Sequence, residues 1–334
     1  MKYKNVELHN VVDIFENEKT GGIGLSRLPL NIHDSLNKNA PGMSKMSSAC
    51  EIRAMLKEGG EAKIVLRAMN DNSVPPIVSV WFGDFCDTTI VLENSDTELI
   101  IKQPNNIELM EELYKKENLG FNPRLLRIRL PHIHTVNIIS IEGDLSYPIE
   151  NATPDKTLLS YGSSITHGAS CIPPEGTYPA QCAYHLGYDV LNLGLGGAAQ
   201  MEMSVAEHIA SRSDWDIATL EMGINVCNWD NETFHKTAES FVAKIVEAHP
   251  DKKIFCIDLF TYKADFSGDT TSAPGFRESV KSIVKALDSK NVFYIDGRKL
   301  LTKPVGLRTD LVHPSDNGMI EMGRNLAAFI EKCI

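Results

Sequence analysis

The second half of this sequence alternates short apolar runs with longer amphipathic stretches, and that alternation restricts the folds open to it. The apolar runs are 156–161, 189–193, 217–222, 253–259 and 292–296; the amphipathic stretches are 178–186, 201–211, 231–249, 273–289 and 315–332. Strands alternating with helices in this way predict a five-stranded parallel sheet with helices on both faces. Ligands of such sheets bind beyond the carboxyl ends of the strands. We therefore expect functional residues directly after the apolar runs.

The first half has a different pattern, in which short Ile-, Val- and Leu-rich segments are separated by Gly, Asn, Asp and Pro clusters. These segments are 49–56, 62–69, 77–82, 88–92, 98–102, 125–130 and 135–142. They predict an antiparallel β-sandwich or jelly roll, with one helix near 106–116. The polar, Pro-containing stretch 142–154 separates the two patterns. We expect a β-sandwich domain at 1–150 and an α/β domain at 155–334.

Charge and cysteine usage exclude several classes of partner. A net charge of -11 disfavours binding to nucleic acid or to an anionic membrane surface. No apolar run reaches the roughly 18 residues that a membrane span requires, and the N-terminus lacks a signal-peptide core. Seven scattered cysteines without CxxC spacing are typical of free thiols in a reducing compartment. We expect a cytoplasmic protein without a metal site; its oligomeric state stays open, a homo-oligomer included.

Ser164 follows the first apolar run of the α/β half, in the string YGSSITHG. A serine on a strand-to-helix turn is exposed to substrate, and backbone N–H groups there point at a developing oxyanion. Read alone, such a serine-rich loop is more simply explained as a helix cap. A catalytic interpretation therefore needs partners elsewhere in the chain.

The candidate base is His313, which follows Asp310 by three residues in DLVHP. At that spacing the aspartate can accept the Nδ1–H of the histidine and leave Nε2 free to face Ser164, as in a Ser-His-Asp triad. The alternative is a loop in which Asp310 caps a turn and His313 is a surface residue. By themselves these residues do not distinguish the two interpretations.

Gly197, in NLGLGG, and Asn225, in MGIN, complete the set. A tetrahedral intermediate needs two or three donors near its oxygen. The backbone N–H groups of Ser164 and Gly197 and the side-chain amide of Asn225 could supply them. A dinucleotide-binding loop is a poor alternative, because the full GxGxxG spacing is missing and no acidic residue ends the next strand.

These four ordered blocks resemble those of the SGNH hydrolase (GDSL-type esterase) superfamily, in the branch with an N-terminal β-sandwich domain. The resemblance covers about residues 155–334 and implies a flavodoxin-like three-layer α/β/α fold. It implies Ser164 as nucleophile, His313 and Asp310 as base and acid, and Ser164, Gly197 and Asn225 as the oxyanion hole. The family's first block usually reads GDS, and here Ser163 replaces an aspartate that is not the catalytic acid.

Other residues are weaker candidates. Trp229 could be a platform for a sugar, whereas Trp215 and Trp81 are predicted to lie in the core; Ser163 and His167 could shape the substrate pocket. The polar stretch 262–274 is interpreted as a lid, a specificity loop or solvent-exposed padding. His132 and His134 alternate like metal ligands, but with no third ligand nearby an exposed strand edge is the better interpretation.

Taken together, the sequence predicts a serine esterase that works through an acyl-enzyme. The resemblance implies that it removes a small acyl group, such as acetyl, from a carbohydrate. It needs no cofactor, and its expected partner is a small-molecule or oligosaccharide ester. Two alternatives stay open. One is an acyltransferase with the same triad, and the other is a non-catalytic carbohydrate-binding protein with a vestigial hydrolase domain.

Overall fold

A computed structural model describes residues 1–17, 20–69, 74–268 and 272–334. Its C-terminal half contains the parallel sheet that the sequence predicts. The strands are β13 (Thr157–Gly162), β14 (Asp189–Gly194), β15 (Ile217–Glu221), β16 (Lys253–Ile257) and β17 (Val292–Ile295). Their order in the sheet is β14-β13-β15-β16-β17, and all neighbours run parallel. This is the 2-1-3-4-5 order of the flavodoxin-like fold, so the predicted fold class is confirmed.

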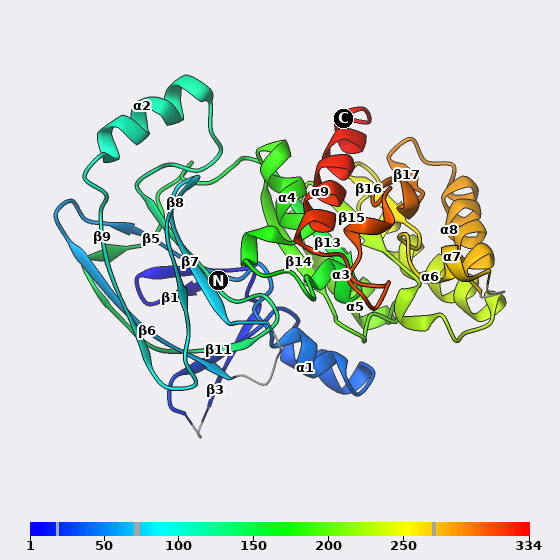
Figure 1. The fold of residues 1–334 in the computed structure, drawn as a ribbon, viewed down its shortest axis with the longest axis horizontal. Coiled ribbons are helices and arrows are strands. Elements are labelled where there is room, and N and C mark those ends of the chain that lie inside the picture. Colours follow the sequence, from blue (N-terminus) through cyan, green and yellow to red (C-terminus); the bar gives the residue numbers. More distant parts are fainter. Residues whose placement is uncertain (18–19, 70–73, 269–271) are drawn as a thin grey trace.

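Helices cover both faces of this sheet (Figure 1). α4 and α9 pack together on one face, and α5, α6 and α8 pack on the other. Successive strand residues supply the two cores; Leu158 joins the α4–α9 side and Leu159 the α5–α6–α8 side. The helices are α3 (Ser164–His167), α4 (Tyr178–Leu186), α5 (Met203–Ser211), α6 (Asn231–Ala248), α7 (Ala264–Ser267), α8 (Ala273–Leu287) and α9 (Asp316–Glu331). All five long helices fall where the sequence predicts them.

Local chemistry explains where these helices begin and end. The Asp230 side chain accepts a hydrogen bond of 2.8 Å from Thr233 N and caps α6, and Thr177 and Ser315 cap α4 and α9 in the same way. α4 ends at Gly187, whose φ of 67° suits a glycine at a helix terminus. The buried residues of α6 recur at helical spacing, at Phe234, Ala238, Phe241, Val242 and Ile245.

The N-terminal half consists of two antiparallel sheets that share one core, as predicted. One sheet has the order β1-β2-β5-β10-β7-β8, with β12 beside β5, and the other has the order β3-β4-β11-β6-β9. Their strands are β1 (Lys2–Tyr3), β2 (Val6–His9), β3 (Asp13–Glu16), β4 (Ile23–Ser26), β5 (Glu51–Leu56), β6 (Glu61–Met69), β7 (Ile77–Phe82), β8 (Phe85–Val91), β9 (Thr97–Lys102), β10 (Leu125–Arg129), β11 (Thr135–Gly143) and β12 (Leu145–Ser146). Three helices accompany them, η1 (Leu30–Ser35), α1 (Ala40–Ser44) and the predicted α2 (Ile107–Glu117).

Period-two patterning builds this sandwich. In β6 every second residue from Ala62 to Ala68 is buried, and these side chains meet those of β5, β7 and β10 across the core. The sequence did not predict β1 to β4, which lie within residues 2–26. These strands have two to four residues, too few for alternation to become visible.

The face of β5 away from the sandwich core packs on the C-terminal half and carries buried charges. Arg53 forms two hydrogen bonds to the carboxylate of Asp189 at the start of β14, of 2.6 and 2.8 Å, and a third to Glu51. Arg127 on β10 also binds Glu51 through two of its nitrogens. All four side chains are almost fully buried, so each buried charge has a partner.

The N-terminal half also covers the free edge of the parallel sheet. β14 is an edge strand, and its carbonyl oxygens at positions 190, 192 and 194 point away from β13. They accept hydrogen bonds from His9, Asn10 and Arg27 of the N-terminal half, at distances of 2.7 to 3.0 Å. An uncovered edge strand is a template for unwanted pairing, and here side chains from the first 27 residues cover it.

Candidate active site

Ser164 is the first residue of α3, directly beyond the carboxyl end of β13. Ser163 is the N-cap, and its hydroxyl accepts a hydrogen bond from Ile165 N. The capping interpretation of this loop therefore applies to Ser163, and Ser164 is left for other contacts. The Ser164 Oγ lies 2.8 Å from His313 Nε2, although 149 residues separate them in the chain.

His313 is held by Asp310 on the same short turn. The Oδ2 of Asp310 lies 2.7 Å from His313 Nδ1, and its Oδ1 accepts hydrogen bonds from the backbone N–H groups of Val312 and His313. With Nδ1 donating to Asp310, Nε2 presents its lone pair to Ser164. Burial alone would raise the pKa of Asp310, but the hydrogen bonds from His313 and Val312 outweigh it and hold that pKa below its usual value.

The backbone of Gly197 and the side chain of Asn225 line the same cavity as Ser164. The Oδ1 of Asn225 accepts a hydrogen bond of 3.0 Å from Ala199 N, which leaves its amide N–H groups as donors. Gly197 has a φ of 65°, in the region that favours glycine, and an added Cβ would meet no atom within 4 Å. Backbone conformation, rather than crowding, therefore accounts for the glycine at this position.

The cavity above Ser164 has a volume of about 430 Å³, which falls in the range of ligand pockets. Its wall combines the residues named above with the side chains of Ile224, Cys227, Tyr262, Lys263 and Val312. Lys263 brings a basic side chain to this wall. Lys263 stands at the point where the predicted loop 262–274 begins. Residues 269–271 of that loop lie outside the described residues.

Three residues considered for substrate contact do not line this cavity. Ser163 and His167 are almost fully buried, and Trp229 packs partly buried against the α5–α6–α8 core. Trp215 is a core residue as predicted, and Trp81 is partly buried. Instead of facing substrate, His167 receives a hydrogen bond at Nδ1 from Gly196 N, beside Gly197, and its Nε2 lies 3.0 Å from the carbonyl oxygen of His132.

The expectation that His132 and His134 lie on an exposed strand edge is wrong. Both are buried, at 2% and 1% exposure. His134 Nε2 lies 2.9 Å from the carbonyl oxygen of Val74, within the N-terminal half. His132 Nε2 lies 2.9 Å from the carbonyl oxygen of Gly168, and Ser48 Oγ donates a hydrogen bond to the carbonyl oxygen of His167. Burial lowers the pKa of His132 to about 4, so this histidine is neutral near pH 7. The N-terminal half thus supports the helix that carries Ser164.

Glu221 is a residue of the site that sequence reasoning missed. It ends β15, is 1% exposed, and its Oε2 lies 2.6 Å from Ser163 N. The only signal in the sequence is a glutamate closing the apolar run IATLE. A charged residue at a strand end is usually solvated, so the run by itself gave no reason to single it out.

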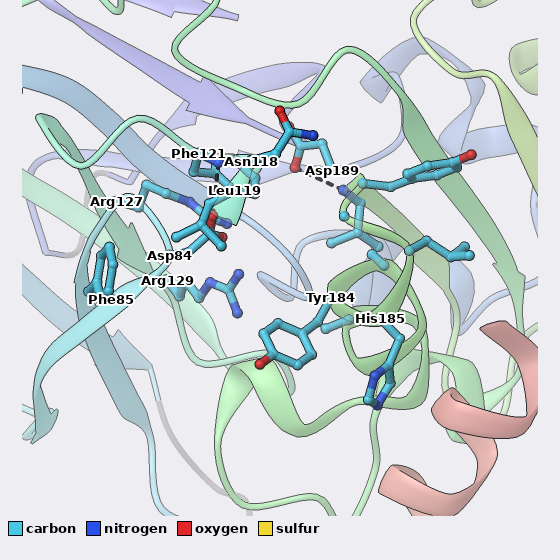
Figure 2. Close-up of a pocket in the computed structure, with 17 residues that line it drawn as sticks. Asp84, Phe85, Asn118, Leu119, Phe121, Arg127, Arg129, Tyr184, His185 and Asp189 are labelled. Carbon is cyan, nitrogen blue, oxygen red and sulfur yellow. Dashed lines mark hydrogen bonds between the residues drawn. The ribbon is translucent and has the colours of Figure 1, made fainter. Parts of the chain in front are cut away.

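A larger cavity, of about 570 Å³, lies between the two halves of the chain (Figure 2). Arg127 and Arg129 of β10 face Tyr184 and His185 of α4 across it, and the Arg129 guanidinium points toward the Tyr184 ring. Asp189, at the amino end of β14, also lines it. Gly197 lies beyond the carboxyl end of that strand, which spans about 16 Å. The two cavities therefore lie at opposite ends of β14, the larger one at its amino end and the one above Ser164 at its carboxyl end.

Two further properties concern only the described part of the chain. Its His, Cys, Asp and Glu side chains form no group of three or more that could hold a metal ion. None of its helices is long and apolar enough to cross a membrane.

Comparison with known proteins gives a family and a fold. Residues 155–331 match the family model described as GDSL-like Lipase/Acylhydrolase family. The sequence matches no curated protein.

Among solved structures, the whole chain is similar to a salicylyl-acyltransferase from a tetracycline biosynthetic pathway, at 17% identity and a TM-score of 0.78, with 98% of this chain and 95% of that chain covered. It is similar to a family two carbohydrate esterase from Cellvibrio japonicus, at 13% identity and a TM-score of 0.62, with coverages of 99% and 96%. It is also similar to an acetyl xylan esterase from Butyrivibrio proteoclasticus, at 10% identity and a TM-score of 0.56, with coverages of 99% and 96%. These likenesses include the N-terminal sheets and establish the fold.

Proposed function

Because the chain belongs to the GDSL-like lipase/acylhydrolase family, we propose that it is a serine esterase that removes a small acyl group through an acyl-enzyme. The observation that carries this proposal is the continuous chain of contacts from Ser164 Oγ to His313 Nε2, at 2.8 Å, and from His313 Nδ1 to Asp310, at 2.7 Å. A base with a free lone pair against a serine hydroxyl, itself oriented by a carboxylate, is the arrangement that activates a serine nucleophile.

In the proposed reaction His313 Nε2 takes the proton of Ser164 as Oγ attacks the ester carbonyl carbon. The N–H groups of Ser164 and Gly197 and the Asn225 amide stabilise the negative oxygen of the tetrahedral intermediate. Asp310 stabilises the imidazolium formed on His313, which then gives its proton to the departing alcohol. Water, deprotonated by His313, attacks the acyl-enzyme and releases the carboxylic acid and Ser164.

We further propose that the acyl group is acetyl and that the alcohol is a carbohydrate. Support comes from the volume of the cavity and from the apolar side chains of Ile224 and Val312 in its wall. Two structural neighbours, a carbohydrate esterase and an acetyl xylan esterase, point the same way. Because the fold alone does not determine a substrate, a panel of acetylated oligosaccharides scored by released acetate is the test of this step.

Two expectations from the sequence remain proposals. The division into domains at 1–150 and 155–334 is supported by the last antiparallel strand ending at Ser146 and the first parallel strand beginning at Thr157. A reducing, cytoplasmic setting is supported by the seven cysteines, all of which are free.

The central experiment measures hydrolysis of p-nitrophenyl acetate by the wild-type protein and by Ser164→Ala. We expect Ser164→Ala and His313→Ala each to lower kcat by roughly 10⁴–10⁶-fold, with a smaller loss for Asp310→Asn. The matched control is Ser211→Ala, at the exposed end of α5. Equal rates for the wild type and Ser164→Ala would overturn the mechanism.

An acyltransferase is the second candidate, and the similarity to a salicylyl-acyltransferase favours it. The same residues would pass the acyl group to an acceptor hydroxyl in place of water. Under that alternative, p-nitrophenol release rises sharply when an acceptor alcohol is added, and the acylated alcohol accumulates. A vestigial, non-catalytic protein is less well supported, since all five proposed residues are in place.

A further inference from the structure

Glu221 is a buried carboxyl group directly behind the proposed nucleophile. It ends β15, which lies in the middle of the parallel sheet beside β13, and only 1% of it is exposed. A charged side chain is rarely placed at such a position unless its polar atoms are used. The contacts of its two oxygens show how this one is used.

Both hydrogen-bond donors that reach Glu221 converge on one oxygen. Oε2 accepts a hydrogen bond of 2.6 Å from Ser163 N and one of 3.1 Å from Thr166 Oγ1. Oε1 is buried and makes no hydrogen bond with any described residue. Burial raises the pKa of the Glu221 carboxyl, and the hydrogen bonds from Ser163 and Thr166 oppose that rise. An unsatisfied buried oxygen is costly, so a role beyond packing is needed to explain the residue.

The two donors lie on either side of Ser164. Ser163 precedes it, and Thr166 follows it by two residues in α3, which has only four residues. A helix this short has almost no stability of its own and takes its shape from what it contacts. Through Oε2, Glu221 holds the turn both before and after Ser164 and so fixes the direction of the Ser164 side chain toward His313.

Gly162 gives the carboxyl group access to this turn. It ends β13 next to Glu221 on the neighbouring strand, and a Cβ added there would clash with Thr166 Oγ1 and with Glu221 Oε2. Any side chain at position 162 would therefore push the carboxyl group away. The glycine before the serine block is explained by this contact, and its φ is not left-handed.

Glu221 also connects the two loops that supply oxyanion donors. It lies four residues before Asn225, separated from it by Gly223 with a φ of 122°. Its main chain therefore begins the Asn225 loop while its side chain binds the Ser164 turn. A shift of either loop changes the distance between the Ser164 N–H and the Asn225 amide.

We propose that Glu221 is a positioning residue, which fixes the Ser163–Thr166 turn relative to the Asn225 loop through a single acceptor oxygen. This inference rests on the proposed esterase function. The Ser163–Thr166 turn needs a hydrogen-bond acceptor at the position of Glu221 Oε2, on a side chain as long as that of glutamate. A side chain with the shape of glutamate and an uncharged acceptor should therefore suffice.

The test compares Glu221→Gln with Glu221→Leu in p-nitrophenyl acetate hydrolysis. Leucine removes the acceptor, and we expect kcat to fall by about 10²-fold with KM little changed, as for a misplaced reacting group. Glutamine keeps an acceptor oxygen in place, and we expect kcat within a few-fold of wild type. If Glu221→Leu does not fold, Thr166→Val removes one of the two donors and should lower kcat by a smaller factor.

Asp258 provides the matched control. It follows the neighbouring strand β16, is fully buried, and accepts hydrogen bonds from Gly297 N and Tyr294 Oη, away from the serine turn. Asp258→Leu should lower the melting temperature as Glu221→Leu does. The folded Asp258→Leu protein should nevertheless keep the kcat of the wild type.

Three outcomes would overturn the inference. They are an unchanged kcat in Glu221→Leu, an equal loss in Glu221→Gln and Glu221→Leu, or an equal loss of kcat in Asp258→Leu. Each of these is distinct from a failure of the proposed function, which would appear as full activity in Ser164→Ala.

Discussion

Arg27 donates a hydrogen bond of 2.9 Å from Nη2 to the carbonyl oxygen of Gly194, the last residue of the edge strand β14. The same guanidinium donates to the carbonyl oxygens of Met43, Met46 and Asn192. The side chain is fully buried, and no carboxylate of the described residues pairs with it. Burial accordingly lowers the pKa of Arg27 to about 10. One arginine from the first 27 residues thus joins the N-terminal half to the strand that leads to Gly197.

The first prediction follows from this contact. Arg27→Met keeps much of the apolar stem but removes the donor of four hydrogen bonds to backbone carbonyl oxygens, of which those of Asn192 and Met43 keep another donor. We expect the free energy of unfolding to fall by roughly 3–5 kcal/mol, measured by urea denaturation. Arg324→Met, at an exposed position on α9, should change it by less than about 0.5 kcal/mol. Equal effects of the two substitutions would show that the buried contacts of Arg27 contribute little.

The second prediction concerns the amide of Asn225. Asn225→Asp keeps an oxygen to accept the Ala199 N–H, so the loop contact is retained. It replaces the amide donor with a carboxylate oxygen, which cannot donate to an oxyanion and repels it. We expect kcat to fall by about 10²–10³-fold with a smaller change in KM. Asn228→Ala, three residues further on and exposed, is the control. Retention of kcat in Asn225→Asp would remove this residue from the proposed oxyanion hole.

The third prediction separates two neighbouring glycines. Gly197→Ala places a side chain at a φ of 65° in open space, which costs about 1–2 kcal/mol of backbone strain. As the backbone relaxes, its N–H turns away from Ser164, and kcat falls by at most the roughly 10²–10³-fold of one lost donor. Gly196→Ala makes ordinary contacts, the nearest at 3.5 Å, without left-handed strain. Gly196→Ala should therefore lower the free energy of unfolding and kcat less than Gly197→Ala does.

The fourth prediction is a pH dependence of stability. His132 has a folded-state pKa of about 4 because of burial, below the value of about 6.5 expected in the unfolded chain. Between these values the unfolded chain binds the proton and the folded chain does not, so stability is lost as the pH falls from about 6.5 to about 4. The contribution of His132 is on the order of 3 kcal/mol.

Urea denaturation at about pH 7 and about pH 4.5 checks this sign. His132→Gln keeps a donor for the Gly168 carbonyl oxygen but cannot take up a proton, so its stability should decline less on acidification than that of the wild type. If the wild type and His132→Gln lose equal stability on acidification, His132 is not the group responsible. Burial also lowers the pKa of His134 to about 4, so His134 would be replaced next.

The sequence by itself determined the architecture and the local pairs. The alternation of apolar runs and amphipathic stretches predicted the five parallel strands and their helices, because burial on two faces leaves a pattern that extends over many residues. The three-residue spacing of Asp310 and His313 allowed a contact within one short turn without deciding it, and the two side chains lie 2.7 Å apart. The periodicity within each segment and the spacing of Asp310 and His313 both depend on residues that are close together in the chain. The catalytic roles assigned to these residues stay predictions until the variants are measured.

Only the tertiary structure decided which distant residues meet. Ser164 and His313 are 149 residues apart, and the helix pair α4–α9 and the strand order place them together. Glu221 contacts Ser163 because β15 lies beside β13. His132 of the N-terminal half and His167 of the C-terminal half are buried where the two halves contact each other. A polar side chain has the same sequence neighbours whether its partner is water or a buried N–H group. The packing of segments far apart in the chain settles which of these it contacts.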